Sequence, residues 1–293
     1  MKSMRHGTFL YNLRDTYIGQ SLHHYGEWSE YEAQLFAQLL RPGDFVLDVG
    51  ANVGGFTVPF AAMVGGRGAV WAFEPQRHLF QLLTANVALN EASLSVHTHH
   101  VALGADAAPG ATVDVPLVNY SIDANFGGVS LLERYGASSA VPLRTLDSFF
   151  PAGARCPTFV KVDVEGMEVH VIRGAAATLR ACQPVLYVEN NCKKDSPAII
   201  GALAALGYAL YWDLQPYFNP RNFFNSSVDI FTNAFMSYNV LAVPEGSKYV
   251  LSRFTRIEPE RPFVHQYDLS KILPHYKTDR PIVQNGDMES CTR

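Results

Sequence analysis

Two short runs of the sequence carry residue types that could bind a nucleoside. The first, residues 45–57, reads FVLDVGANVGGFT and is typical of a buried parallel strand, a glycine turn and a helix start. The second, residues 69–75, reads AVWAFEP and follows after the length of one helix, so that Glu74 ends another buried strand. Either run alone could be a simple tight turn with Glu74 on the surface. Both together, in this order and spacing, predict a nucleoside pocket in which Glu74 holds the ribose hydroxyls.

The glycine spacing narrows the choice of nucleoside. A dinucleotide fold needs G-x-G-x-x-G, in which the middle glycine admits a pyrophosphate. Here Asn52 stands two residues after Gly50, and the next glycine is Gly54. Asp48 would repel a phosphate at close range, but it can accept hydrogen bonds from an ammonium group. A cationic nucleoside without phosphate points to S-adenosylmethionine, and Asn52 disfavours a nicotinamide oxidoreductase.

Further carboxylates follow two later strands and could act on the acceptor of a methyl group. Asp163 and Glu165 come after the run FVKV, where ligands of open α/β sheets bind. We favour a functional role for Asp163, whereas capping of the next helix is the alternative for Glu165. Glu189 follows the run VLYV. It orients a substrate hydroxyl or, if burial raises its pKa, acts as general base; the alternative is a solvated strand end.

Histidine is the side chain best suited to remove a proton near neutral pH. His24, together with His23, lies in an N-terminal segment that could close over the cofactor, and His24 is our candidate base. Because the sulfonium is already activated, methyl transfer needs mainly in-line placement, and a base can be absent. His97, His99 and His100 occupy adjacent strand positions that do not converge, so we expect no metal site.

The elements that must position these residues alternate between helix and strand patterns. We expect a helix capped by Ser29 that runs to Leu40, and a hairpin insertion within residues 104–142. The remaining expected helices cover residues 55–64, 75–87, 167–173 and 197–206; the expected strands cover 45–49, 69–73, 94–101, 158–164, 185–189, 208–212 and 238–243, the last two as an antiparallel pair. The aromatic residues between Tyr208 and Tyr238 form either ordinary core or an acceptor wall.

Composition bounds the class of protein. The chain has 293 residues, 48% hydrophobic content and a net charge of −4 without a basic block, so we expect a full core and no nucleic-acid partner. We predict no signal peptide and no membrane segment. The four cysteines are widely spread, which favours reduced thiols and a cytoplasmic location; they are Cys156, Cys182, Cys192 and Cys291.

Four runs of the sequence resemble the FkbM methyltransferase family. They are VLDVGANVG at 46–54, FEP at 73–75, LRTLD at 143–147, and VKVDVEG at 160–166 with Gly174 and Ala175. The resemblance implies a Rossmann-like class I methyltransferase sheet of seven strands, the last one antiparallel, and S-adenosylmethionine as cofactor without a required metal. It also implies cofactor-binding roles for a set of residues: Asp48, Gly50, Asn52 and Gly54 on the methionine part, Glu74 on the ribose, Ala102 and Leu103 beside the adenine, and Asp163 with Glu165 facing the methyl group and acceptor.

The expected activity is transfer of a methyl group to a hydroxyl of a small molecule, such as a sugar, a polyketide or another secondary metabolite. The alternatives are an N-methyltransferase on the same fold and a non-catalytic partner protein that binds S-adenosylmethionine. We expect a flap and helix over residues 1–40, the methyltransferase domain over 41–244 and a tail over 245–293. A homo-oligomer is left open.

Overall fold

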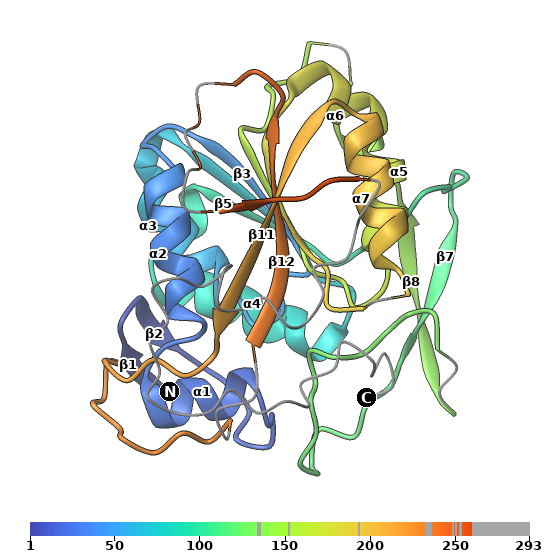
Figure 1. Cartoon of the computed structure of the whole chain (residues 1–293). Helices are drawn as coiled ribbons and strands as arrows, with labels where there is room; N and C mark the ends of the chain where they lie inside the picture. Colours follow the sequence, from blue (N-terminus) through green and yellow to red (C-terminus); the bar gives the residue numbers. More distant parts are fainter. Residues whose placement is uncertain are drawn as a thin grey trace.

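A mixed sheet with a parallel part forms the centre of the molecule. The computed structural model describes residues 1–133, 136–151, 153–192, 194–231, 236–247, 249, 251 and 254–259. The strands of the central sheet are ordered β13-β11-β12-β10-β9-β3-β4-β5 (Figure 1). Its parallel part consists of β3 (Phe45–Val49), β4 (Ala69–Phe73), β5 (Val96–His99), β9 (Phe159–Val162) and β10 (Val185–Glu189). Every residue of β3 and β9 is buried, as expected of parallel strands that are covered on both faces.

Alternating side chains of the strands face two hydrophobic cores. In β3, Phe45 and Leu47 contribute to the core beneath α5, α6 and α7, whereas Val46 contributes to the core beneath α2, α3 and α4. Figure 1 shows α2 and α3 on one side of the sheet and α5, α6 and α7 on the other. These helices are α2 (Glu30–Leu39), α3 (Thr57–Val64), α4 (Arg77–Leu89), α5 (Glu168–Gly174), α6 (Ala176–Cys182) and α7 (Ser196–Ala205). Because both faces are covered, a ligand reaches the sheet at its carboxyl edge.

The last strands close the sheet as predicted. β11 (Tyr208–Pro216) and β12 (Met236–Pro244) pair antiparallel along their whole length, and β12 also pairs antiparallel with β10. The expected α/β sheet with an antiparallel closing strand is therefore confirmed. An additional strand, β13 (Thr255–Arg256), joins the edge of β11. It belongs to the expected tail, of which residues 260–293 lie outside the described part.

The insertion forms a smaller sheet beside the main one. β7 (Thr112–Pro116) and β8 (Ser138–Arg144) pair antiparallel, which confirms the expected hairpin, and β6 (Ala102–Leu103) pairs parallel with β8. In Figure 1 this hairpin projects from the body of the molecule. Because β6 continues directly from the region of β5, the hairpin is anchored next to the carboxyl edge of the sheet.

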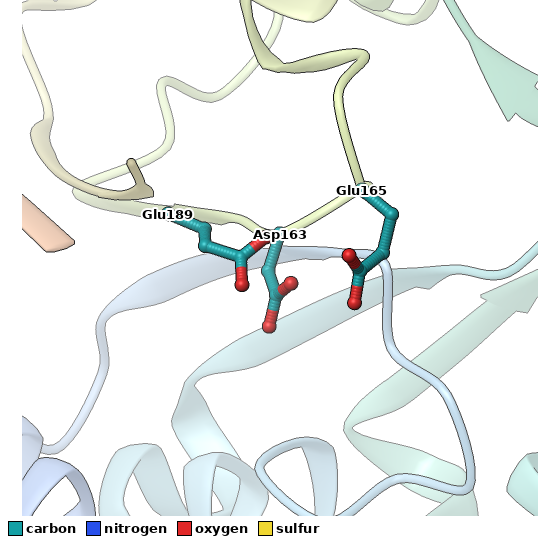
Figure 2. Close-up of side chains that lie close together, drawn as sticks. All are labelled: Asp163, Glu165 and Glu189. Atoms are coloured by element: carbon teal, nitrogen blue, oxygen red, sulfur yellow. The ribbon is translucent and has the colours of Figure 1, made fainter. Parts of the chain in front are cut away.

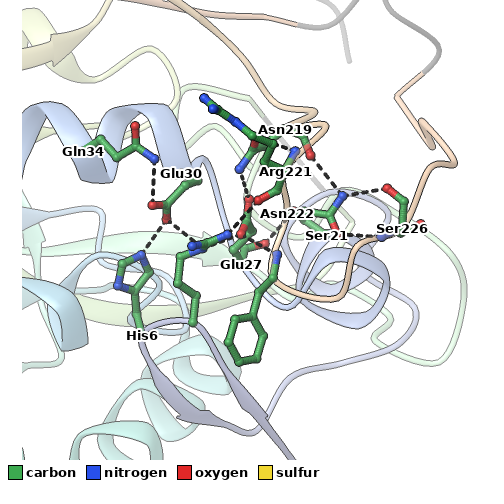
Figure 3. A network of polar contacts seen from close by, with 11 residues as sticks. His6, Ser21, Glu27, Glu30, Gln34, Asn219, Arg221, Asn222 and Ser226 are labelled. Atoms are coloured by element: carbon green, nitrogen blue, oxygen red, sulfur yellow. Dashed lines mark hydrogen bonds and ion pairs between the residues drawn. The ribbon is translucent and has the colours of Figure 1, made fainter.

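The N-terminal segment is tied to the loop between β11 and β12 by a polar network (Figure 3). The N-terminal segment contains β1 (Lys2–Met4), β2 (Gly7–Phe9) and α1 (Ile18–Tyr25). The buried Glu27 carboxylate accepts hydrogen bonds from Arg5 Nε at 2.6 Å, Asn219 Nδ2 at 2.7 Å and the Phe223 amide at 2.9 Å. Such charge-assisted bonds hold both segments in one place.

None of the described helices is long and apolar enough to cross a membrane.

Three local predictions need correction. Ser29 stands at the N-cap of α2, but its φ of 38° lies in the left-handed region and its side chain makes no capping bond. The strand expected over 94–101 is confined to β5, and Leu94 is 99% exposed. The thiols are not reduced: Cys156 and Cys182 form a disulfide, and no described cysteine is free. The fold brings their Cα atoms to 5.4 Å, a proximity that spacing in the sequence does not reveal. Cys291 lies outside the described residues.

Candidate cofactor and acceptor site

A cleft opens at the carboxyl ends of β3, β4, β9 and β10. Nine of the predicted site residues line it: Asp48, Gly50, Asn52, Glu74, Ala102, Leu103, Asp163, Glu165 and Glu189. Two predicted residues do not. Gly54 lies beneath the turn, and His24 is exposed on α1, where its ring packs edge-on against His23. The cleft therefore unites the two groups of carboxylates that the sequence analysis considered separately.

The glycine turn after β3 is shaped by close backbone approach. Gly50 has a φ of +84°, and a Cβ atom built on it would lie 1.7 Å from the Asp163 carbonyl oxygen. Only glycine fits there without a backbone shift. The Gly50 and Ala51 amides both donate to the Phe73 carbonyl at 3.0 Å, which fixes the turn against β4. Gly54, with a φ of +88°, completes the entry into α3.

Glu74 is the carboxylate at the end of β4. It is 4% exposed, and its two oxygens accept hydrogen bonds from the amides of Asn52 and Gln76, each at 2.8 Å. Burial raises the pKa of Glu74 to about 7, although the two amide bonds oppose this rise. A carboxylate oxygen can accept a second hydrogen bond, so Glu74 can hold the turn and still receive ligand hydroxyls.

Asp48 lies at the end of β3, beneath the turn. Its Oδ2 accepts a hydrogen bond from Thr57 Oγ1 at 2.6 Å. Its Oδ1 is buried without a hydrogen bond, and the nearest cation is Lys161 Nζ at 3.9 Å. Burial raises the pKa of Asp48, and the Lys161 ammonium and the Thr57 hydroxyl counteract this. An orphaned buried carboxylate oxygen beside a cleft is costly unless a donor reaches it.

The part of the cleft next to the end of β5 is apolar. Ala102 and Leu103 of β6 are buried and line it together with Val101 and Phe73. Gln76 closes this part, since its Nε2 donates to the Phe126 carbonyl at 2.9 Å. This composition suits a flat aromatic base rather than a charged group.

Three carboxylates converge at the mouth of the cleft (Figure 2). Asp163 and Glu165 follow β9, and Glu189 ends β10, so adjacent parallel strands bring them together. One oxygen of each lies within 4.8 Å of the others. They could share one ligand, either the hydroxyls of an acceptor or a cation. The prediction that no metal is required stays a prediction.

Aromatic residues from distant segments form a further wall of the cleft. Tyr17, Trp28 and Tyr217 line the cleft, and the rings of Trp28 and Tyr217 stack at 5.1 Å. The loop before β8 adds Asn125 and Val129. The aromatic run between Tyr208 and Tyr238 therefore contributes Tyr217 to the wall, as one of its two interpretations expected.

The sequence analysis missed Lys161, which also lines the cleft. It is 3% exposed, and its Nζ donates to Asp163 Oδ2 at 2.9 Å. Burial lowers the pKa of Lys161, but the carboxylates of Asp163 and Asp48 raise it more, so that the pKa lies above its usual value. A lysine inside the buried run FVKV was the signal, because an unpaired cation is not buried there.

The residues fit S-adenosylmethionine. Its ammonium could donate to the orphaned Asp48 Oδ1, its ribose hydroxyls could donate to Glu74, and the apolar part of the cleft could take the adenine. No single residue of this set identifies the cofactor, but the three features stand in the order in which the parts of the molecule are joined.

The chain is similar to known methyltransferases. The FkbM methyltransferase domain matches residues 48–210, more than half of the chain. Among solved structures, the FkbM methyltransferase of Methylobacillus flagellatus KT is 18% identical over 72% of this chain and 50% of its own, with a TM-score of 0.44. This chain thus spans about half the length of that protein.

Two further structures are similar. An S-adenosylmethionine-dependent O-methyltransferase of Thermotoga maritima is 13% identical over 75% of this chain and 67% of its own, with a TM-score of 0.43. Fibrillarin of Aeropyrum pernix, solved with natively bound S-adenosylmethionine, is 11% identical over 73% of this chain and 74% of its own, with a TM-score of 0.40. No curated protein matches the chain. By the domain match, the chain belongs to the FkbM family of S-adenosylmethionine-dependent methyltransferases.

Proposed function

We propose that this protein transfers a methyl group from S-adenosylmethionine to a hydroxyl of a small molecule, such as a sugar, a polyketide or another secondary metabolite. One observation carries the proposal: a single cleft is lined by Asp48 and Glu74 at the ends of β3 and β4 and by Asp163, Glu165 and Glu189 at the ends of β9 and β10. The first pair suits the cofactor, and the second group suits an acceptor that carries hydroxyls.

In this proposal, cofactor binding depends on buried acceptors. Asp48 accepts from the ammonium, Glu74 accepts from the ribose, and Ala102 with Leu103 flanks the adenine. The turn that Gly50, Asn52 and Gly54 shape follows the methionine part. When bound, S-adenosylmethionine supplies a methyl group that is already activated by its sulfonium.

The acceptor side orients a hydroxyl and takes up its proton. Asp163, Glu165 and Glu189 can each accept a hydrogen bond from an acceptor hydroxyl, and one of them can receive the proton as the oxygen attacks. Trp28 and Tyr217 cover the acceptor and exclude water from the cleft. His24 is exposed outside the cleft, so the proton acceptor in this proposal is a carboxylate.

The remaining predictions concern the surroundings of the enzyme. A homo-oligomer and the three-part division of the chain at residues 40 and 244 stay predictions. A cytoplasmic location stays a prediction too, although disulfides such as Cys156–Cys182 are rare in that compartment.

Calorimetry and a turnover assay test the proposal together. We expect S-adenosylmethionine to bind the wild type and the control Asp114→Asn, an exposed carboxylate on β7, but to bind Glu74→Ala far more weakly. We expect S-adenosylhomocysteine to form when hydroxylated acceptors are supplied. Absence of binding would refute the cofactor site. Turnover with amines alone would favour an N-methyltransferase, and binding without turnover on either class would favour a non-catalytic protein.

A further inference from the structure

Lys161 occupies an unusual position in the sheet. Among the described residues it is the one lysine or arginine that is buried, at 3% exposure. It stands in β9, directly opposite Asp48 of β3 and Tyr187 of β10 in the parallel register. Directly paired residues of neighbouring strands point to the same face, so the ammonium of Lys161 and the carboxylate of Asp48 share one layer beneath the cleft.

The charged groups around Lys161 are almost all negative. Its Nζ lies 2.9 Å from Asp163 Oδ2 and 3.9 Å from Asp48 Oδ1. From α2, the fully buried Glu32 adds a further carboxyl, whose pKa burial raises to about 7. The residues that α3 brings to this layer are uncharged. Thr57 donates a hydrogen bond to Asp48, and the ring of Phe56, just before α3, lies 5.3 Å from Lys161 Nζ. The Tyr187 hydroxyl donates a hydrogen bond to the buried Asp213, and burial also raises the pKa of Asp213.

A charge count follows from these contacts. Ionised Asp48 and Asp163 together carry −2, and the Lys161 ammonium reduces this to −1. S-adenosylmethionine carries a sulfonium, an ammonium and a carboxylate, hence +1, and its demethylated product is a neutral zwitterion. This trio of net charge −1, beside the other carboxylates of the cleft, attracts the first more strongly than the second, because the cleft is poorly screened.

We propose that Lys161 is a positioning residue that sets the charge of the cofactor site. Its ammonium pairs with Asp163 and leaves the Asp48 Oδ1 ionised and without a hydrogen bond for the ligand's cation. The inference rests on the proposed function, since it assumes that this cleft binds S-adenosylmethionine. It adds that the preference for the sulfonium over its neutral product depends on the balance between one lysine and two carboxylates.

Removing the charge of Asp163 should lower this preference, and removing the charge of Lys161 as well should restore it. Asp163→Asn leaves Asp48 and Lys161 with no net charge, so the ratio of S-adenosylmethionine to S-adenosylhomocysteine affinity should fall about tenfold. Adding Lys161→Met to Asp163→Asn returns the net charge to −1, because the loss of the ammonium is offset by the loss of the Asp163 carboxylate, which raises the pKa of Asp48. This double variant should therefore recover the ratio of the wild type. A role of Lys161 in folding alone would not predict recovery upon a second, disruptive substitution.

The single variant Lys161→Met provides a second readout. When the Lys161 ammonium is removed, the pKa of Asp48 rises further, so Asp48 of the free protein holds a proton that must be released on binding. We expect about one more proton released per bound S-adenosylmethionine than in the wild type, and about a tenfold further loss of affinity for each pH unit of acidification. Lys161→Arg keeps the charge and should keep the proton count of the wild type.

The measurements are calorimetric titrations of the full chain with S-adenosylmethionine and S-adenosylhomocysteine in two buffers of different ionisation enthalpy. They run between about pH 6 and 8, a range that includes the Glu74 pKa of about 7. Equal affinity ratios in Asp163→Asn and the double variant would overturn the inference, and so would an unchanged proton count in Lys161→Met. If Lys161→Met fails to fold, the comparison of Asp163→Asn with the double variant decides. Failure of the wild type to bind S-adenosylmethionine would instead refute the proposed function.

Discussion

Replacing Glu74 by glutamine should make the free protein less sensitive to alkaline pH while it removes cofactor binding. Glu74 is 4% exposed and its pKa is raised by burial from 4.5 to about 7. Below pH 4.5 the carboxyl is neutral in both the folded and the unfolded chain. Between 4.5 and about 7 the folded chain binds more protons, so stability falls as the pH rises. Above that range the full cost of ionisation is present.

The size of the effect follows from the same shift. At 1.36 kcal/mol per pKa unit, a rise from 4.5 to about 7 corresponds to about 3 kcal/mol. Glutamine does not titrate, so Glu74→Gln lacks this cost. It does lose one of the two amide bonds from Asn52 and Gln76, because its NH₂ group cannot accept. That loss of about 1–3 kcal/mol is independent of pH.

The assay is urea denaturation of the free protein at several values between pH 5 and 8 (from near the unfolded pKa of a carboxyl to above the folded one). The stability of Glu74→Gln relative to the wild type should increase by about 2.5 kcal/mol over this range, because part of the cost of ionisation is already present at about pH 5. Its affinity for S-adenosylmethionine should be at least about 100-fold weaker, from the loss of charge-assisted bonds to the ribose. Asp114→Asn should show neither effect. Parallel stability curves for Glu74→Gln and the wild type would show that Glu74 ionises normally, and the reasoning would fail.

Other substitutions test the remaining parts of the structure. Cys156→Ser with Cys182→Ser should lower the free energy of unfolding by about 3–4 kcal/mol, because the disulfide closes a loop with a sequence separation of 26. Denaturation measures this, and unchanged stability would contradict a formed disulfide. Gly50→Ala should abolish nucleoside binding, since its Cβ would lie 1.7 Å from the Asp163 carbonyl oxygen. If calorimetry showed that the variant binds S-adenosylmethionine as tightly as the wild type, the tight turn would be refuted. Tyr217→Ala should raise KM for the acceptor several-fold and leave the cofactor affinity unchanged; the opposite pattern in steady-state kinetics would place Tyr217 on the cofactor side.

The sheet and the cofactor side could be predicted from sequence because their signals are local. Apolar runs that end in Asp48 and Glu74 identify neighbouring parallel strands, and Gly50 marks the turn where no Cβ fits. The order of the strands follows once the family resemblance is seen. These features depend on periodicity and turn chemistry, which single segments of chain carry by themselves.

The rest depends on contacts between distant segments. The role of Lys161 becomes visible only when β3 and β9 are placed in register, which opposes it to Asp48. The disulfide needs the approach of the loop before β9 to the end of α6. His24 was a reasonable base by residue type, but the orientation of α1 leaves it exposed away from the cleft.

The network around Glu27 has a consequence for the order of folding. Glu27 and Asn219 are separated by 192 residues, and Glu27 and Phe223 by 196, so these bonds close long loops. Contacts of such high sequence separation are slow to form, because the entropy of loop closure opposes them until the intervening chain is ordered. During synthesis, the aromatic wall that contains Trp28 and Tyr217 can therefore assemble only after the ribosome has released the segment beyond β11. The acceptor side of the cleft should therefore form late, after the parallel strands that precede β11.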